Sequence, residues 1–139
     1  MSGKTDKAKR KAESVKVWRI DVRNYKVEVA DRDAAGNPIM ERGRMKMVRD
    51  DFDVKGSLAS ILFNQELRLS VEETFEAKEV ADKIRAAKDY VLLDSKEMDR
   101  VRASYKVIKG IPEQQLEFFK RIRDAEEIEA AASEPEDEE

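Results

Sequence analysis

Apolar and polar residues alternate along residues 15–29, where β-branched and aromatic side chains are separated mainly by charged ones. Such alternation is typical of a strand with one buried and one exposed face. The alternation changes phase at Arg23-Asn24, where a bulge or a tight turn would exchange the two faces. The pattern therefore predicts either one long bent strand or two short strands.

A segment rich in turn-forming residues, 31–38, follows this strand region. Alternation then resumes at Met45 and Met47, which predicts a returning strand over residues 44–48. An isolated hairpin is only marginally stable in water, so these strands are expected to pack on the helices that follow.

Helical spacing replaces the alternation after residue 55, and it predicts three or four helices. The first is short, over residues 56–64. The second should begin at a capping box, in which Ser70 and Glu73 satisfy each other's free amides, and run to residue 88 or nearby. Its inward side is expected to carry Phe75, Ala77, Val80, Ala81, Ile84 and Ala87.

The third predicted helix begins at a second capping box, formed by Asp94 and Glu97, and ends before Gly110, which suits a left-handed backbone position. A fourth helix is predicted to start near Pro112, because proline is tolerated in the first turn, and to run to residue 131 or nearby. The expected architecture is one α+β domain in which a small N-terminal antiparallel β-hairpin or meander packs on three to four helices.

Charge is distributed unevenly along the 139 residues, although the net formal charge is only −3. Residues 1–26 carry nine basic and three acidic side chains, whereas residues 126–139 carry eight acids and no base. The two ends have few apolar side chains to bury, so we expect residues 1–14 and 132–139 to be disordered tails. The folded domain is then expected to span residues 15–131.

Composition removes several kinds of chemistry. The chain has no cysteine and no histidine, which excludes thiol nucleophiles, disulfides, imidazole bases and the metal sites that depend on either residue. No glycine-rich phosphate-binding motif is present. We therefore expect a protein without enzymatic activity and without a cofactor. No apolar run approaches the roughly 20 residues that cross a bilayer, so we expect a cytoplasmic protein with no membrane contact.

Asp50, Asp51 and Asp53 form the closest group of carboxylates. Three acids at this spacing could hold Mg²⁺ together with water, as in a nuclease, because Mg²⁺ prefers oxygen ligands. The same acids also suit a turn between a strand and a helix, where they would cap the helix and stabilise its positive end. We favour the capping interpretation, and we expect no metal site.

The candidate binding residues lie in the two strand regions. Aromatic and basic residues combine in the first region, which is typical of surfaces that bind single-stranded nucleic acid, although a tryptophan there also suits the core. Methionines in the second region suit adaptable contacts with a protein partner. The partner-binding hypothesis names Trp18, Arg19, Arg23, Tyr25, Lys26, Met45 and Met47.

Three short segments follow one another in a characteristic order. The first is a turn after a strand, the second lies inside a capped helix, and the third is an apolar segment just before the next capped helix. They are Gly36-Asn37-Pro38-Ile39, Ala81-Asp82-Lys83-Ile84 and Val91-Leu92-Leu93-Asp94. In this order, over residues 30–125, the chain resembles a loose group of small proteins of unknown function encoded by phages and prophages. The resemblance implies a small accessory protein that acts by binding, and it supplies no catalytic residues.

Together these observations predict a non-enzymatic protein that binds or regulates another protein, from a host cell or from a phage. The alternative is a nucleic-acid-binding regulator that uses the basic N-terminal segment and the strand around Trp18. A sequence pI near 5.3 counts against this alternative, since nucleic-acid-binding proteins usually concentrate positive charge on the folded surface. The sequence leaves the oligomeric state open.

Overall fold

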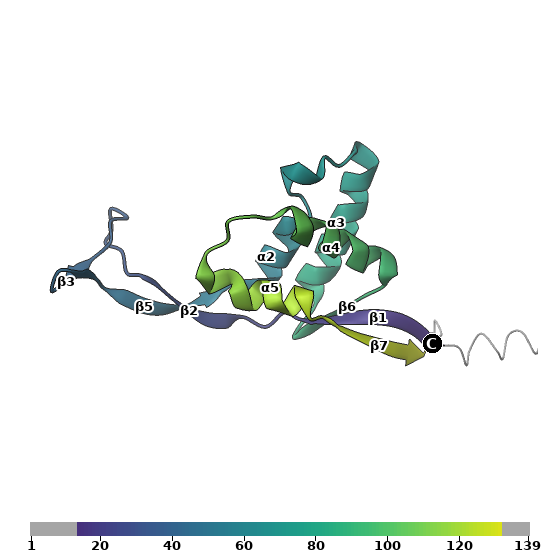
Figure 1. Ribbon diagram of the computed structural model, residues 1–139, viewed down its shortest axis with the longest axis horizontal. Coiled ribbons are helices and arrows are strands. Elements are labelled where there is room, and N and C mark those ends of the chain that lie inside the picture. Colours follow the sequence, from purple (N-terminus) through teal and green to yellow (C-terminus); the bar gives the residue numbers. More distant parts are fainter. Residues whose placement is uncertain (1–13, 132–139) are drawn as a thin grey trace, which may run out of the picture.

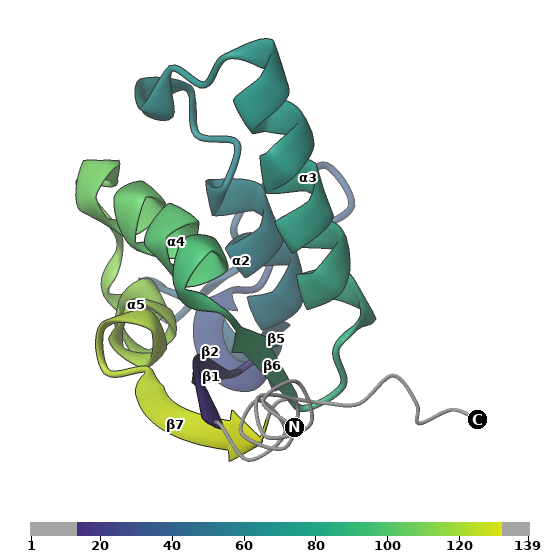
Figure 2. The same ribbon diagram turned by 90° about the vertical axis from the view of Figure 1, so that its right-hand side faces the viewer.

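The computed structural model describes residues 14–131, and in this range four α-helices lie on one side of an extended layer of β-strands (Figures 1 and 2). The helices are α2 (Val54–Ile61), α3 (Val71–Ala86), α4 (Ser95–Val107) and α5 (Leu116–Arg123), with 3₁₀ turns η1 (Gln65–Leu67) and η2 (Glu113–Gln115). The strands are β1 (Ser14–Asp21), β2 (Tyr25–Ala30), β3 (Met40–Glu41), β4 (Arg44–Met45), β5 (Met47–Phe52), β6 (Tyr90–Leu93) and β7 (Glu126–Ala131). The predicted α+β class is confirmed.

The strand region predicted over residues 15–29 is two strands that belong to different sheets. β1 is the central strand of an antiparallel sheet with the order β6-β1-β7, whereas β2 pairs with β5. The change of phase at Arg23-Asn24 is where the chain leaves the first sheet for the second. The predicted tails lie outside the described residues, except that Ser14 already belongs to β1.

The antiparallel pair β2–β5 and the small hairpin β3–β4 form a projecting arm, residues 25–52 (Figure 1). The arm extends away from the helices at the end of the molecule opposite β7. The returning strand predicted at 44–48 is thus confirmed in position, but a break at Lys46 divides it between β4 and β5. Beyond β2 the chain forms the tip of the arm instead of a third strand of a compact meander.

The hydrophobic core lies between the helices and the β6-β1-β7 sheet. Ile20 of β1, Val22 just after the end of that strand, and Val91 and Leu93 of β6 are buried against the helices. The helices contribute Val54, Leu58, Ala59, Leu62, Ala77, Val80, Ala81, Ile84, Met98, Val101, Phe118, Phe119 and Ile122. Both capping boxes form as predicted, at Ser70 with Glu73 and at Asp94 with Glu97.

Two of the helix predictions are wrong in part. Phe75 was expected to face inward, but its side chain is 62% exposed because it lies on the opposite side of α3 from Ala77, Ala81 and Ile84. The fourth helix was expected to reach residue 131, but it ends at Arg123.

The segment after this helix forms β7, which pairs along the edge of β1. This pairing places Ile128 opposite Val17, and the side chains of Glu126 and Glu127 form ion pairs with Arg19 and Lys16. The open edge of β1 therefore outweighs the helical preference of a segment rich in glutamate and alanine.

Candidate binding surfaces

The predicted binding residues do not form one surface, because β1 and the arm lie at opposite ends of the molecule (Figure 1). Trp18 is half-buried, and its ring packs against the core. The guanidinium carbon of Arg102 in α4 lies 5.3 Å from the centre of this ring. Trp18 therefore joins β1 to α4 and is not presented as an open stacking surface.

Arg19 is next to the buried Ile20 in β1, so its side chain lies on the opposite, exposed face of the β6-β1-β7 sheet, and Arg23 follows just after the end of β1. No helix covers this face of the sheet (Figure 2). Their guanidinium carbons lie 5.3 and 5.1 Å from the centre of the Tyr90 ring. Arg23 also donates a hydrogen bond of 2.8 Å to the Asp21 carboxylate, and Arg19 forms an ion pair with Glu126. Both arginines therefore already have partners within the protein, and their charges stabilise the fold and are not free for a ligand.

The Asp21 carboxylate, at the end of β1, makes the stability of the protein depend on pH. Hydrogen bonds from the Arg23 side chain, aided by the Arg23 backbone and the charge of Arg121, hold the pKa of Asp21 below its ordinary value of 3.8. The stabilisation is complete at pH values above the pKa of Asp21 in the unfolded chain, and it is lost as the pH falls through the lower pKa of the folded state.

We expect the Asp21→Asn variant to be less stable than the wild type at pH 6 and the difference to shrink as the pH approaches 2, because both proteins then carry an uncharged group at this position. The free energy of unfolding, measured in urea across this pH range, tests the prediction. As a control, Asp99→Asn should change stability little, because the Asp99 side chain has no ion-pair partner within residues 14–131. A difference for Asp21→Asn that stays constant with pH would contradict the expected linkage.

Tyr25 anchors the base of the arm to α5. Its hydroxyl accepts a hydrogen bond of 3.1 Å from the backbone N–H of Phe118 and donates one of 2.9 Å to the backbone oxygen of Gln114. Its ring stacks on Phe52 with 5.1 Å between ring centres, and burial raises the pKa of Tyr25. Lys26, the next residue, forms a cross-strand ion pair of 2.8 Å with Asp51. Both predicted residues therefore hold the arm together.

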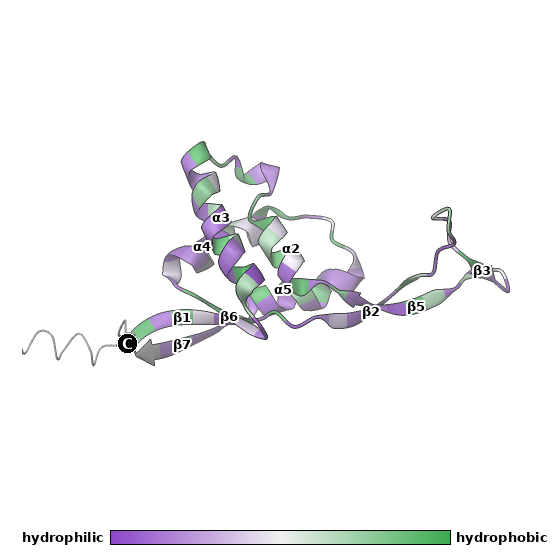
Figure 3. Cartoon of the chain, turned by 180° about the vertical axis from the view of Figure 1, so that it is seen from behind, coloured by the Kyte–Doolittle hydropathy of each residue, from purple (hydrophilic) through white to green (hydrophobic). Residues whose placement is uncertain are grey.

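The tip of the arm, residues 40–49, is where side chains suited to binding remain uncovered. Met40, Met45 and Met47 are each about half exposed, and Met40 lies directly opposite Met45 in the β3–β4 pair. Figure 3 shows hydrophobic residues interspersed with hydrophilic ones along the arm from β5 to this tip, far from the core. The sequence indicates all three methionines near the hairpin, but only Met45 and Met47 were among the predicted binding residues; Met40, opposite Met45, belongs to the same cluster.

The turn between β3 and β4 explains how this tip is formed. Arg42 and Gly43 both have positive φ angles, 53° and 80°, which is the geometry of a two-residue hairpin turn that matches strand twist. The side chains of Arg42, Arg44 and Arg49 have no acidic partner within the part of the chain that the structure describes. Four cations and one acid lie between residues 40 and 49, so the arm tip combines uncovered methionines with positive charge.

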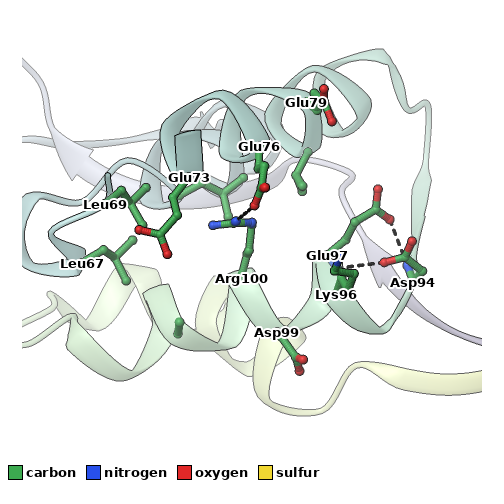
Figure 4. A pocket seen from close by; sticks show the side chains of 13 residues that line it. Leu67, Leu69, Glu73, Glu76, Glu79, Asp94, Lys96, Glu97, Asp99 and Arg100 are labelled. Carbon is green, nitrogen blue, oxygen red and sulfur yellow. Dashed lines mark hydrogen bonds and ion pairs between the residues drawn. The ribbon is translucent and has the colours of Figure 1, made fainter. Parts of the chain in front are cut away.

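A second candidate surface is a groove of about 680 Å³ between α3, α4 and the η1 turn (Figure 4). Its apolar lining comes from Leu62, Leu67, Leu69, Val80 and Ala103, and its charged lining is Glu73, Glu76, Glu79, Asp94, Lys96, Glu97, Asp99 and Arg100. Six carboxylates and two cations give this groove a net formal charge of −4. We refer to it as the α3–α4 groove.

Most carboxylates of the α3–α4 groove are already engaged. Glu73 closes the capping box of α3, and hydrogen bonds with Ser70 hold the pKa of Glu73 below its ordinary value. Glu76 forms an ion pair with Arg100 across the groove. Glu79 and Asp99 lie on opposite sides of the groove and have no cationic partner among residues 14–131 (Figure 4). The sequence does not indicate this groove, because the spacing of the acids in α3 is also that of an ordinary solvent-exposed helix face.

The aspartates between β5 and α2 do not converge on a common point. Asp53 accepts a hydrogen bond of 3.0 Å from the Gly56 amide and caps α2, which confirms the capping role for this residue. Asp51 faces Lys26, and Asp50 accepts a hydrogen bond from the Asp51 amide. Among residues 14–131, no group of three acidic side chains is arranged to hold a metal ion.

Comparisons with family models, with curated proteins and with solved structures find no match to this chain. Within the described residues, none of the helices has the length and apolar character needed to cross a membrane.

Proposed function

We propose that this protein acts by binding another protein through its projecting arm, without catalysing a reaction. The observation that carries the proposal is the arm tip, where Met40, Met45 and Met47 stay exposed at the end of the arm and far from the core. Methionine is flexible and polarisable, so a cluster of methionines can adapt to an apolar surface on a partner. Exposed apolar side chains gathered in one place commonly mark such contacts.

The anchoring of the arm supports this proposal. Its base is held by the Tyr25–Phe52 stack and by hydrogen bonds to α5, so the tip is presented on a supported ribbon. A binding element held in position loses less conformational entropy when the partner binds. The resemblance to small proteins of phages and prophages fits an accessory protein of this kind, with a bacterial host protein or a phage protein as partner.

Replacement of two of the methionines tests the role of the arm. We expect the Met40→Asp/Met45→Asp protein to capture its partner at least about tenfold less well than the wild type, because two charges would be buried in an apolar contact. The full chain is immobilised and exposed to a nuclease-treated lysate of a bacterial host, and the captured proteins are quantified by mass spectrometry. The thermal unfolding of the variant should match that of the wild type, since both side chains are exposed.

A matched control is available on α3, where Val71 and Phe75 are also exposed. The Val71→Asp/Phe75→Asp protein introduces the same charges and should capture the partner as the wild type does. An equal loss of capture in both variants would indicate non-specific binding by exposed apolar residues and would contradict a role for the arm. Capture from an untreated lysate that is absent from the nuclease-treated lysate would favour the nucleic-acid alternative.

A further inference from the structure

The arm tip and the α3–α4 groove are complementary in charge and in apolar character. The tip has three more cations than acids, and the groove has four more carboxylates than cations. The tip exposes methionines, and the groove has three leucines in its lining. Opposite charges around apolar centres are the usual arrangement of a specific protein interface.

The unpaired side chains of the two surfaces also match. Arg42 and Arg44 flank Gly43 at the turn and have no acidic partner in the described range, while Glu79 and Asp99 of the groove have no cationic partner there. An arginine can form two parallel hydrogen bonds with one carboxylate, so each unpaired acid can receive one arginine of the turn.

The arm of a molecule extends away from its own helices, so its tip does not lie at its own α3–α4 groove (Figure 1). We propose that the arm tip of one copy of this protein docks in the α3–α4 groove of a second copy. This inference rests on the proposed function and names the partner as a further copy of the same chain. The two surfaces that meet are different, so the contact is head-to-tail and repeats into a ring or a filament.

In this contact, Met40 and Met45 lie on the leucines that line the groove, and Arg42 and Arg44 pair with Glu79 and Asp99. The apolar part supplies most of the affinity, and the ion pairs orient the arm and speed the encounter. Raising the salt concentration from 0.1 M to 1 M shortens the screening length from about 10 Å to about 3 Å. We therefore expect association that weakens with salt but is not abolished by it.

Charge reversal on each surface separately tests the contact. We expect the wild-type full chain to show a mass that rises with concentration in sedimentation experiments. The arm variant Arg42→Glu/Arg44→Glu and the groove variant Glu79→Lys/Asp99→Lys should each associate at least about tenfold more weakly, because like charges then face each other. The chain that carries all four substitutions should regain association, since its charges are exchanged between the two surfaces.

This fourfold variant separates head-to-tail docking from a symmetric contact between two arms. If the arms bind each other, the groove variant associates like the wild type, which would overturn the proposal. A fourfold variant that associates no better than the two double variants would overturn it as well. The control Glu72→Lys/Glu113→Lys carries the same change of charge on residues that do not line the groove, and it should assemble like the wild type.

A wild-type chain that stays monomeric at roughly 1 mM has a dissociation free energy below about 4 kcal/mol, which would also overturn the docking of a second copy. The capture experiment with the methionine variants still tests binding to a different protein in that case. The two measurements therefore distinguish failure of self-docking from failure of the proposed function.

Discussion

Replacement of Phe118 by alanine is expected to lower the free energy of unfolding by about 3–5 kcal/mol, the range found when a buried phenylalanine is removed from a core. Phe118 is only 2% exposed, and its ring lies against Phe119 and Phe52, with ring centres 4.7 and 5.5 Å away. These contacts join α5 to the base of the arm. A protein domain is stable by about 5–15 kcal/mol, so this loss is a large share of the total stability.

Urea denaturation followed by circular dichroism measures this loss. Leu116→Ala is the matched control, because Leu116 lies in the same helix with its side chain 56% exposed, and its removal should change stability by no more than about 0.5–1 kcal/mol. Similar denaturation midpoints for the two variants would contradict the burial of Phe118 at the junction of α5 and the arm.

The elements predicted best from the sequence are those set by neighbouring residues. The beginnings of α3 and α4 depend on capping boxes that span four residues, and the apolar spacing of each helix follows within a few turns. The change of phase at Arg23-Asn24 is visible for the same reason, but the sequence does not show that the chain passes there from one sheet to another. Signals of this kind need no knowledge of distant parts of the chain.

The elements that escaped prediction depend on contacts between distant residues. β7 is a strand because residue 128 lies opposite residue 17, and β6 pairs with the other edge of β1. The local sequence of each of these two segments fits a helix or a short connecting loop equally well. Only the two open edges of β1, which are unsatisfied without partners, decide their conformation.

The candidate surfaces follow the same division. Met45 and Met47 were predicted as binding residues from local pattern, and both remain exposed on the arm. Tyr25 was predicted to bind a partner, but its hydroxyl contacts the backbone at residues 114 and 118, about ninety positions along the chain. The α3–α4 groove exists only because the packing of α4 and η1 beside α3 brings their side chains together.

Replacement of Arg121 by methionine is expected to lower the free energy of unfolding by about 2–3 kcal/mol, since hydrogen bonds of a charged group each contribute about 1.5–3 kcal/mol. The Arg121 side chain is only 14% exposed, and it crosses from α5 to the corner between β1 and β2. One guanidinium nitrogen donates to the backbone oxygens of Asp21 and Arg23, at 3.2 and 2.6 Å. The guanidinium carbon also lies 5.1 Å from the centre of the Tyr25 ring.

The geometry of these contacts makes Arg121→Lys an informative second variant. Lysine keeps the charge but has a single nitrogen, so it cannot reach the two backbone oxygens and also replace the bond of 2.9 Å from Arg121 Nε to the Glu117 carboxylate. It should therefore recover less than half of the lost stability. Arg123→Met, in the same helix, removes an exposed arginine paired with Asp124 and should change the stability little, because solvent screens this pair. Chemical denaturation of the three variants decides the outcome. Full recovery by lysine would mean that charge alone holds the corner between the two sheets.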